Sequence, residues 1–117
     1  MNEVIRTILQ RKGTKEYAAK PVEKETLMLL LRCAAAAPNA FNAQKWHFTA
    51  VSNAAVLAEM EEKCYRALVK SGVCSADEPY APFYHAPAVL VFSAGKDNLF
   101  GKQDCPAALG NGALAAE

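Results

Sequence analysis

Three basic residues lie within five positions near the start of the chain, in the stretch RKGTKEY at residues 11–17. Arg11 offers a planar fork of donors that matches phosphate oxygens, and Lys12 and Lys15 supply compact positive charges. Gly13 has no side chain, so a ligand can approach its backbone closely. These residue types at this spacing are suited to binding an anion. A solvated surface beside a helix end explains the same charges without any ligand.

A second polar stretch, PNAFNAQKW at residues 38–46, contains two asparagines and a glutamine. Amide side chains can donate to and accept from a flat heterocycle or a polyol. Turn chemistry is the simpler interpretation, because asparagine also satisfies loop backbones. Trp46 is more often a core residue than a stacking surface. No G-x-G-x-x-G or G-x-x-x-x-G-K-[ST] loop is present, which excludes the Rossmann and P-loop modes of holding a phosphate.

Three helices are expected in the first 70 residues, because apolar residues recur at helical spacing. Asn2 is expected to cap the first helix, and Gly13 to end it with a positive φ. The second helix follows Pro21 and is stopped by Pro38. The third spans about residues 54–70. The expected buried stripes are Val4, Ile5, Ile8 and Leu9, then Leu27, Leu30, Leu31, Ala34 and Ala35, then Leu57, Met60, Cys64 and Leu68.

Two strands and a last helix complete the expected order α, α, β, α, β, α. WHFTAV at residues 46–51 has the composition of a strand. PAVLVFSA at residues 87–94 is a continuous apolar run, which is typical of a central strand covered on both faces. Asp104 is expected to cap the last helix, with Pro106 just inside it.

Composition limits the classes of function. The 117 residues suit one domain, and 13 basic against 12 acidic residues leave a net charge of +1. That balance argues against a DNA-binding helix-turn-helix that would use RKGTK. Of the hydrophobic residues, 23 are alanine, so the core is thin and self-association is plausible.

Other side chains carry weaker signals. The four cysteines match no zinc spacing, and we interpret them as reduced thiols of a cytoplasmic protein. His47 and His85 are interpreted as packed or surface imidazoles. No stretch is long and apolar enough for a membrane span, and the N-terminus does not have the features of a signal peptide.

Four stretches occur in a distinctive order: RKGTKEY, APNAFNAQKWHF, FYHAPAVLVF and DCPAALGNGALAAE. Together they resemble the successive motifs of the nitroreductase family of FMN-dependent oxidoreductases. Those motifs are R-x-S-x-[RK]-x-[FY], P-S-x-x-N-x-Q-P-W-x-F, [FY]-x-x-A-P and D-x-x-x-A-x-x-N-x-x-L-A-A. The resemblance covers nearly the whole chain.

The resemblance implies an α+β fold with a central, mostly antiparallel sheet flanked by helices. It implies a homodimer with two FMN sites at the interface. Arg11 would meet the FMN phosphate, Lys12 and Gly13 would line the ribityl-phosphate region, and Lys15 would lie near the N1–C2 carbonyl edge. The flavin of the other subunit would be reached by Pro38, Asn39, Ala40 and Asn42.

The implied activity transfers electrons from NAD(P)H through FMN to a quinone or nitroaromatic acceptor. No side chain of the chain is assigned a catalytic role, because the cofactor carries the chemistry. Gly13 and Asn39 stand where the family commonly has serine, and Lys45 where it has proline. Members of the family continue past the last helix with a glycine-rich turn, another strand and a late basic residue that helps to hold the phosphate. We therefore expect residues 1–117 to be a single nitroreductase-like domain that is truncated at its C-terminus. The alternative is a non-catalytic dimeric module that has lost a complete FMN site.

Overall fold

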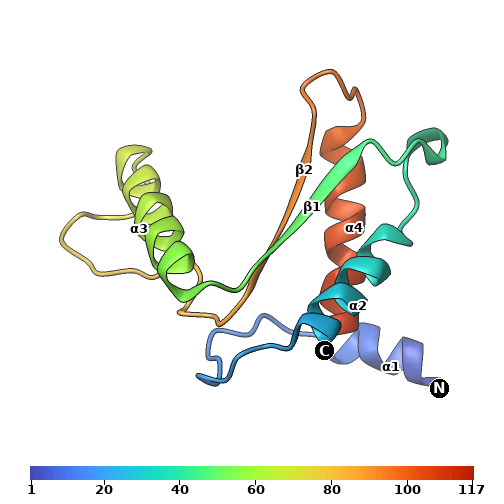
Figure 1. Cartoon of the computed structure of the whole chain (residues 1–117), viewed down its shortest axis with the longest axis horizontal. Helices are drawn as coiled ribbons and strands as arrows, with labels where there is room; N and C mark the ends of the chain where they lie inside the picture. The colour runs from blue at the N-terminus through green and yellow to red at the C-terminus, as the bar shows by residue number, and fades with distance from the viewer. The chain divides into compact units, whose positions relative to one another are not determined.

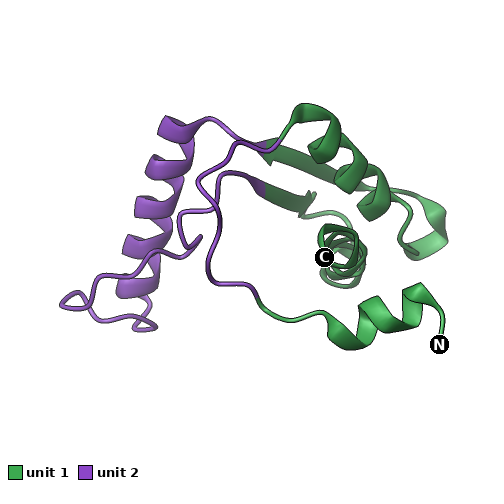
Figure 2. Cartoon of the chain, turned by 90° about the horizontal axis from the view of Figure 1, so that it is seen from below, with its two compact units in different colours: residues 1–13, 23–50, 90–117 green, residues 14–22, 51–89 purple.

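The computed structural model describes all residues from Met1 to Glu117, and the chain divides into two compact units (Figure 2). Unit 1 consists of Met1–Gly13, Glu23–Ala50 and Leu90–Glu117, and unit 2 of Thr14–Val22 and Val51–Val89. The elements traced in Figure 1 are, in order, α1 (Glu3–Gln10), α2 (Lys24–Ala35), the 3-10 helix η1 (Ala40–Asn42), β1 (Trp46–Val51), α3 (Ala54–Lys70), β2 (Val89–Ala94) and α4 (Gly101–Ala116). None of these helices has the length and apolar character needed to cross a membrane.

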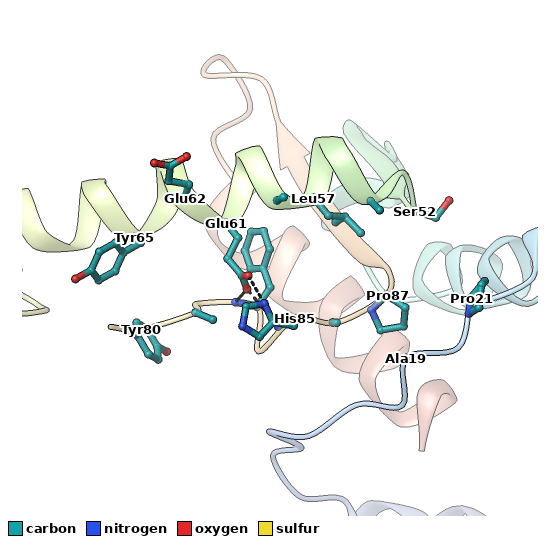
Figure 3. A pocket seen from close by; sticks show the side chains of 15 residues that line it. Ala19, Pro21, Ser52, Leu57, Glu61, Glu62, Tyr65, Tyr80, His85 and Pro87 are labelled. Atoms are coloured by element: carbon teal, nitrogen blue, oxygen red, sulfur yellow. Dashed lines mark hydrogen bonds and ion pairs between the residues drawn. The ribbon is translucent and has the colours of Figure 1, made fainter. Parts of the chain in front are cut away.

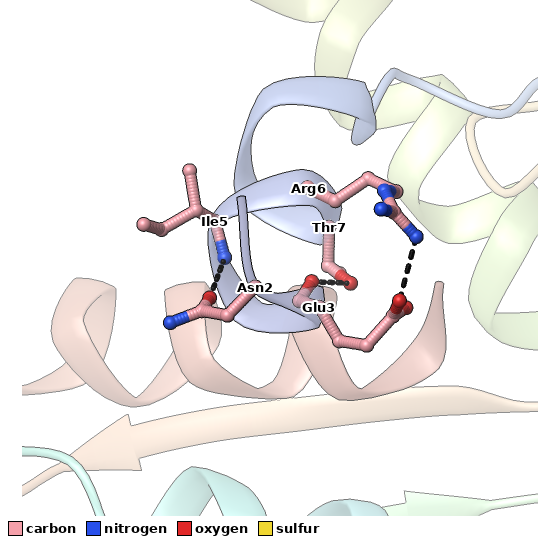
Figure 4. A network of polar contacts seen from close by, with 5 residues as sticks. All are labelled: Asn2, Glu3, Ile5, Arg6 and Thr7. Carbon is pink, nitrogen blue, oxygen red and sulfur yellow. Dashed lines mark hydrogen bonds and ion pairs between the residues drawn. The ribbon is translucent and has the colours of Figure 1, made fainter.

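Helix α1 begins at the cap that the sequence predicts. The Ile5 backbone N–H donates to the side-chain oxygen of Asn2 at 2.9 Å, which satisfies one of the free amides of the first turn (Figure 4). The helix ends at Gln10, and Arg11 already has extended backbone angles of φ −56° and ψ 133°. The prediction that Gly13 ends it with a positive φ is therefore wrong, since Gly72 is the glycine with that conformation.

The first apolar stripe is not buried. Val4, Ile5, Ile8 and Leu9 remain between 45% and 68% exposed. The helix has the predicted amphipathic spacing, but its apolar face has no partner of comparable size within the chain. Periodicity indicates which face of a helix is apolar and says nothing of what covers that face.

The sheet has two antiparallel strands, β1 and β2, which belong to unit 1 except for Val51 and Val89 (Figure 1). This confirms the predicted α+β class and antiparallel pairing. Strand β1 occupies the predicted residues, whereas β2 begins at Val89, two residues after Pro87, which lacks the N–H that a ladder needs. The prediction of a central strand is wrong for this chain, because β2 has β1 as its one neighbour.

The core of unit 1 is built from alanines. Ala34, Ala37 and Ala108 are at most 4% exposed. Small side chains let α2 and α4 approach closely, and aromatic rings then fill the space against the sheet. The Phe48 and Phe92 rings meet edge to face with centroids 4.9 Å apart. Partly buried residues around the alanines are Trp46, Phe48, Phe92 and Ala107.

Helix α4 begins before the predicted start. Gly101 opens it and Phe100 occupies the cap position, so the prediction of Asp104 as the cap is wrong. Asp104 instead begins a buried stripe at every fourth position, continued by Ala108 and Gly112. The turn before the helix is held locally, since the Phe100 N–H donates to the Asn98 side-chain oxygen at 3.0 Å.

Unit 2 is organised by α3, which has the predicted bounds. The Asn53 side chain accepts the N–H of Val56 at 3.1 Å and caps the helix, while Leu57 is its buried residue. The long connection after α3 is tied back by Tyr65. Its hydroxyl lies 3.2 Å from the carbonyl oxygen of Ser75 and 3.0 Å from that of Glu78.

Candidate functional site

The predicted anion-binding cations follow α1 rather than belonging to it. Arg11 is the C-cap residue, and the last turn of the helix contains no basic residue. Arg11, Lys12 and Lys15 are all exposed. None of the ion pairs in the structure involves them. Arg11 directly follows the last turn, so its charge also favours the C-terminal end of the helix dipole, as the solvated-surface interpretation expects.

Arg6 provides a contrast within the same helix. Its guanidinium pairs with the Glu3 carboxylate at 2.6 Å, one turn earlier, as Figure 4 shows. The structure thus neutralises the arginine inside α1 and leaves the one that follows it available. An unpaired, exposed guanidinium keeps both arms of its fork free for an incoming anion.

Gly13 lies in open surroundings. A Cβ atom placed on it would have no heavy atom within 4 Å. The glycine is therefore not required by close packing in this chain, and its backbone is accessible from outside. Lys15 lies two residues further along the chain, in the first segment of unit 2.

The second predicted group, residues 38–42, forms a tight loop before β1. Asn39 uses both ends of its amide on this loop, accepting the Gln44 N–H at 2.8 Å and donating to the Ala37 carbonyl at 3.3 Å. Asn42 accepts from the Gln44 side chain at 3.3 Å, and its own NH₂ group stays free to donate. Asn39 therefore shapes the loop, whereas Asn42 can reach a ligand. Pro38 is exposed.

Ala40 is held by a residue that lies 64 positions away. Its N–H donates to the Asp104 carboxylate at 3.0 Å, and its carbonyl accepts from Ala43 at 3.1 Å. Both backbone polar groups of Ala40 are thus engaged, so any ligand contact would come from its methyl group. Asp104 is 6% exposed and links the loop to the first part of α4. Sequence reasoning missed this role, because an aspartate two residues before a proline is also typical of a helix cap.

Arg11 and the loop at residues 38–42 both belong to unit 1, and they do not meet there. The end of α1, where Arg11 follows, and the loop before β1 lie toward opposite ends of α4 in Figure 1. The bond between Ala40 and Asp104 fixes the loop near the N-terminal end of α4. One chain therefore presents Arg11 and the amide loop on separate surfaces.

Unit 2 contains a cavity of about 620 Å³ (Figure 3). Glu61 on α3 anchors one wall, since its carboxylate accepts the N–H of Phe83 at 2.8 Å and lies 3.0 Å from Nδ1 of His85. Tyr84 and His85 both have positive φ, so Glu61 holds a turn that these residues do not favour by themselves. The His85 side chain is 83% exposed, in agreement with a surface imidazole.

Two tyrosines meet beside this cavity. The hydroxyl groups of Tyr80 and Tyr84 are 3.3 Å apart, and their rings are edge to face. The hydrogen bond with Tyr84 raises the pKa of Tyr80 above its ordinary value, with smaller effects from desolvation and nearby charge. Tyr80 is therefore a neutral phenol near pH 7, and nothing in its surroundings prepares it to act as a base.

Comparison with known proteins agrees with these motifs. A sequence model described as the nitroreductase family matches residues 8–117. The chain therefore belongs to the nitroreductase family, which confirms the resemblance on which the site residues were assigned. A protein of Archaeoglobus fulgidus named as an NADH dehydrogenase/NAD(P)H nitroreductase is 32% identical over 62 residues, which is 53% of this chain and 36% of that protein.

Solved structures share the fold over nearly the whole chain. A Bacteroides fragilis nitroreductase with bound FMN superposes with a TM-score of 0.86 at 31% identity, covering 99% of this chain and 65% of that one. A Clostridium difficile FMN-dependent nitroreductase superposes with a TM-score of 0.87 at 28% identity, covering 98% of this chain and 55% of that one. The chain thus spans between about one half and two thirds of the length of these structures.

Proposed function

We propose that this protein is an FMN-dependent oxidoreductase that transfers electrons from NAD(P)H through bound FMN to quinone- or nitroaromatic-type acceptors. The observation that carries the proposal is the group of exposed, unpaired cations Arg11, Lys12 and Lys15. They lie within the residues that the family model matches, and the motif that they resemble would meet the cofactor phosphate. The Bacteroides fragilis relative is described with bound FMN.

The residues present fit the phosphate end of FMN. Arg11 can donate two parallel hydrogen bonds to phosphate oxygens, and Lys12 adds a second charge. The open surroundings of Gly13 leave its backbone N–H accessible to the ribityl phosphate. When bound, FMN supplies the acceptance of a hydride and its delivery as electrons to a second substrate.

The chain's own contribution is binding and electrostatics. The ammonium group of Lys15 would stand beside the N1–C2 carbonyl edge, where negative charge grows on reduction, and would favour the reduced form. Asn42 would donate its free amide N–H to the flavin of the partner subunit. Asn39 and Asp104 would hold the loop that presents it.

The separation of the two groups supports a shared site. If Arg11 and the amide loop contacted one flavin within one chain, they would need to lie close together, yet they lie toward opposite ends of α4. In a homodimer, the cations of one subunit and the amide loop of the other could contact the same flavin. Two equivalent sites then follow from the two-fold symmetry.

The first test is an absorbance spectrum of the purified protein, desalted before and after addition of FMN. Flavin bands that stay with the protein indicate a formed site, and NADH or NADPH should then bleach them. Arg11→Ala is expected to weaken FMN binding roughly tenfold or more, because a hydrogen bond between charged groups contributes about 1.5–3 kcal/mol. Lys24→Ala, which removes an exposed lysine outside the motif, serves as the charge-matched control.

A colourless protein that fails to retain added FMN would contradict the proposal. The chain would then be better described as the non-catalytic dimeric module, provided that sedimentation still shows a dimer. Retention of FMN with equal affinity by wild type and Arg11→Ala would overturn the assignment of the phosphate site.

A further inference from the structure

The loop between Asn39 and Gln44 has an unusual backbone. Phe41, Asn42 and Gln44 have φ angles of 56°, 50° and 51°. Asparagine tolerates this left-handed region, whereas a bulky aromatic residue seldom adopts it. The chain therefore places a phenylalanine where local conformation favours asparagine or glycine.

Contacts that do not involve the Phe41 ring hold the loop in this shape. Asp104 accepts the N–H of Ala40 at 3.0 Å, and Asn39 accepts that of Gln44 at 2.8 Å. The Asn42 N–H also donates to the Asn39 carbonyl at 3.0 Å. Surrounding structure thus maintains the strained conformation, as is common at functional sites.

The Phe41 ring gains little from the protein around it. It is 91% exposed, and the ring it meets is Phe100, edge to face with centroids 6.0 Å apart. Burial within one chain therefore does not explain the phenylalanine, and the left-handed backbone of the turn does not favour it either. A large apolar side chain that is strained and solvated at once is expected where a ligand covers it.

A cavity of ring size lies beside Phe41. Its volume is about 190 Å³, and an apolar cavity of about 150 Å³ is known to hold one benzene molecule. Leu99 and Phe100 provide further apolar walls, and Leu99 is itself 88% exposed. One lysine and two aspartates also line the space, with no net positive charge to attract an anion: Lys45, Asp97 and Asp104.

We infer that Phe41 determines acceptor specificity, by stacking its ring on a flat, uncharged, single-ring aromatic acceptor. The inference rests on the proposed function, because Ala40 and Asn42 on either side are residues expected to reach the flavin. An aromatic face offers offset or edge contacts to a planar ring that a saturated ring cannot match. Asp104, which accepts the Ala40 N–H, holds the backbone next to Phe41 before the acceptor arrives.

The test compares nitrobenzene with nitrocyclohexane, which have similar size and the same polar group but differ in planarity. Binding to the oxidised, FMN-loaded protein is measured without NAD(P)H, from changes in flavin absorbance and by calorimetry. Wild type is expected to bind nitrobenzene about fivefold to tenfold more tightly than nitrocyclohexane. Phe41→Ala should reduce this preference to less than about twofold, and Phe41→Tyr should restore it.

Two further measurements separate this role from a structural one. Phe41→Asn should keep or raise the midpoint of thermal unfolding, since asparagine suits the left-handed backbone and no burial is lost. Val73→Ala, which trims an apolar side chain that is 71% exposed, is the control and should leave the preference unchanged.

The outcomes are distinguishable. If wild type retains no FMN, the proposed function fails, and this inference fails with it. If FMN is retained by wild type and by Phe41→Ala, and the preference for nitrobenzene is equal in both, the inference alone is overturned. A marked fall in the unfolding midpoint of Phe41→Asn would likewise overturn it, by showing that the ring serves packing.

Discussion

At the scale of single residues, Asp104 connects the fold to the candidate site. Asp104→Ala would leave the Ala40 N–H without its acceptor and remove a buried carboxylate that is 6% exposed. We expect the free energy of unfolding to fall by about 1–3 kcal/mol. Asp104→Asn keeps an acceptor oxygen at this position, so its free energy of unfolding should fall by less than that of Asp104→Ala. Urea denaturation measures both, and equal stability of Asp104→Ala and wild type would contradict the assignment.

Tyr65 supports a second prediction at this scale. Its hydroxyl lies within 3.4 Å of three backbone carbonyls of the connection after α3, at Ser75, Ala76 and Glu78. The single hydroxyl hydrogen can be donated to one of these carbonyls at a time. Tyr65→Phe removes this hydrogen bond, so it should destabilise unit 2 by about 0.5–1.5 kcal/mol. Proteolytic cleavage of the connection after α3 should then become faster. Limited proteolysis checks this. Tyr17→Phe, which removes one exposed contact to Thr14, is the control.

Candidate site residues could be proposed where a motif is local in sequence, and their contacts with FMN stay a prediction. The cations at 11–15 and the loop at 38–42 are continuous stretches, so the family motifs that they resemble can be found directly in the sequence. The role of Asp104 was not predictable, because its partner Ala40 lies 64 positions away. Phe41 was missed for a related reason, because the local sequence at residues 40–42 does not indicate a positive φ or an exposed ring at this phenylalanine.

At the scale of elements, α4 shows how backbone and packing compete. A Cβ atom placed on Gly110 would have no heavy atom within 4 Å, so a side chain fits there. Gly110→Ala is expected to stabilise the protein by about 0.5–1 kcal/mol, because alanine restricts the unfolded chain and favours helix. Chemical denaturation measures the gain. A loss of stability would show that a further surface packs against this face of α4.

Gly112, on the same helix, differs from Gly110 because it faces the core. A Cβ there would lie 3.6 Å from the Phe92 ring and 3.8 Å from Ala34, at ordinary contact distance. Alanine therefore fits, whereas Gly112→Leu would have to displace the core between α4 and the sheet. We expect Gly112→Leu to be strongly destabilised while Gly112→Ala is tolerated.

Element boundaries were predictable where polar residues mark them. Asn53 accepts the Val56 N–H and opens α3, and the predicted span of that helix matches the structure. The start of α4 was misplaced because Phe100 and Gly101 carry no cap signature. The preceding turn is fixed instead by Asn98, which accepts from Phe100 and donates to the Lys45 carbonyl at 3.0 Å.

At the scale of the whole molecule, burial is unusually low for the amount of apolar sequence. Five hydrophobic residues are buried, and three of them are alanine. The sheet has two strands, each with one neighbour. The sequence correctly predicts a thin core from its 23 alanines, but composition cannot specify which surface completes it.

The apolar face of α1 is the surface from which we predict self-association. Val4, Ile5, Ile8 and Leu9 are at least 45% exposed, and a contiguous apolar stripe of this kind is typical of an interface. Sedimentation velocity should give a mass near twice the 12.6 kDa of one chain. The double variant Ile8→Gln/Leu9→Gln keeps helix-forming residues and the net charge, and it should shift the protein toward monomer. Val73→Gln is the control.

Cofactor binding should be coupled to this association if each flavin is shared between two subunits. FMN at about 100 times its dissociation constant would then stabilise the dimer by about 2.7 kcal/mol per site, which lowers the concentration needed for dimer formation. The double variant should in turn retain FMN poorly, although both of its substitutions lie outside the 11–15 cations. A monomer that binds FMN as tightly as wild type would contradict the shared site and would require each flavin to be held within one chain.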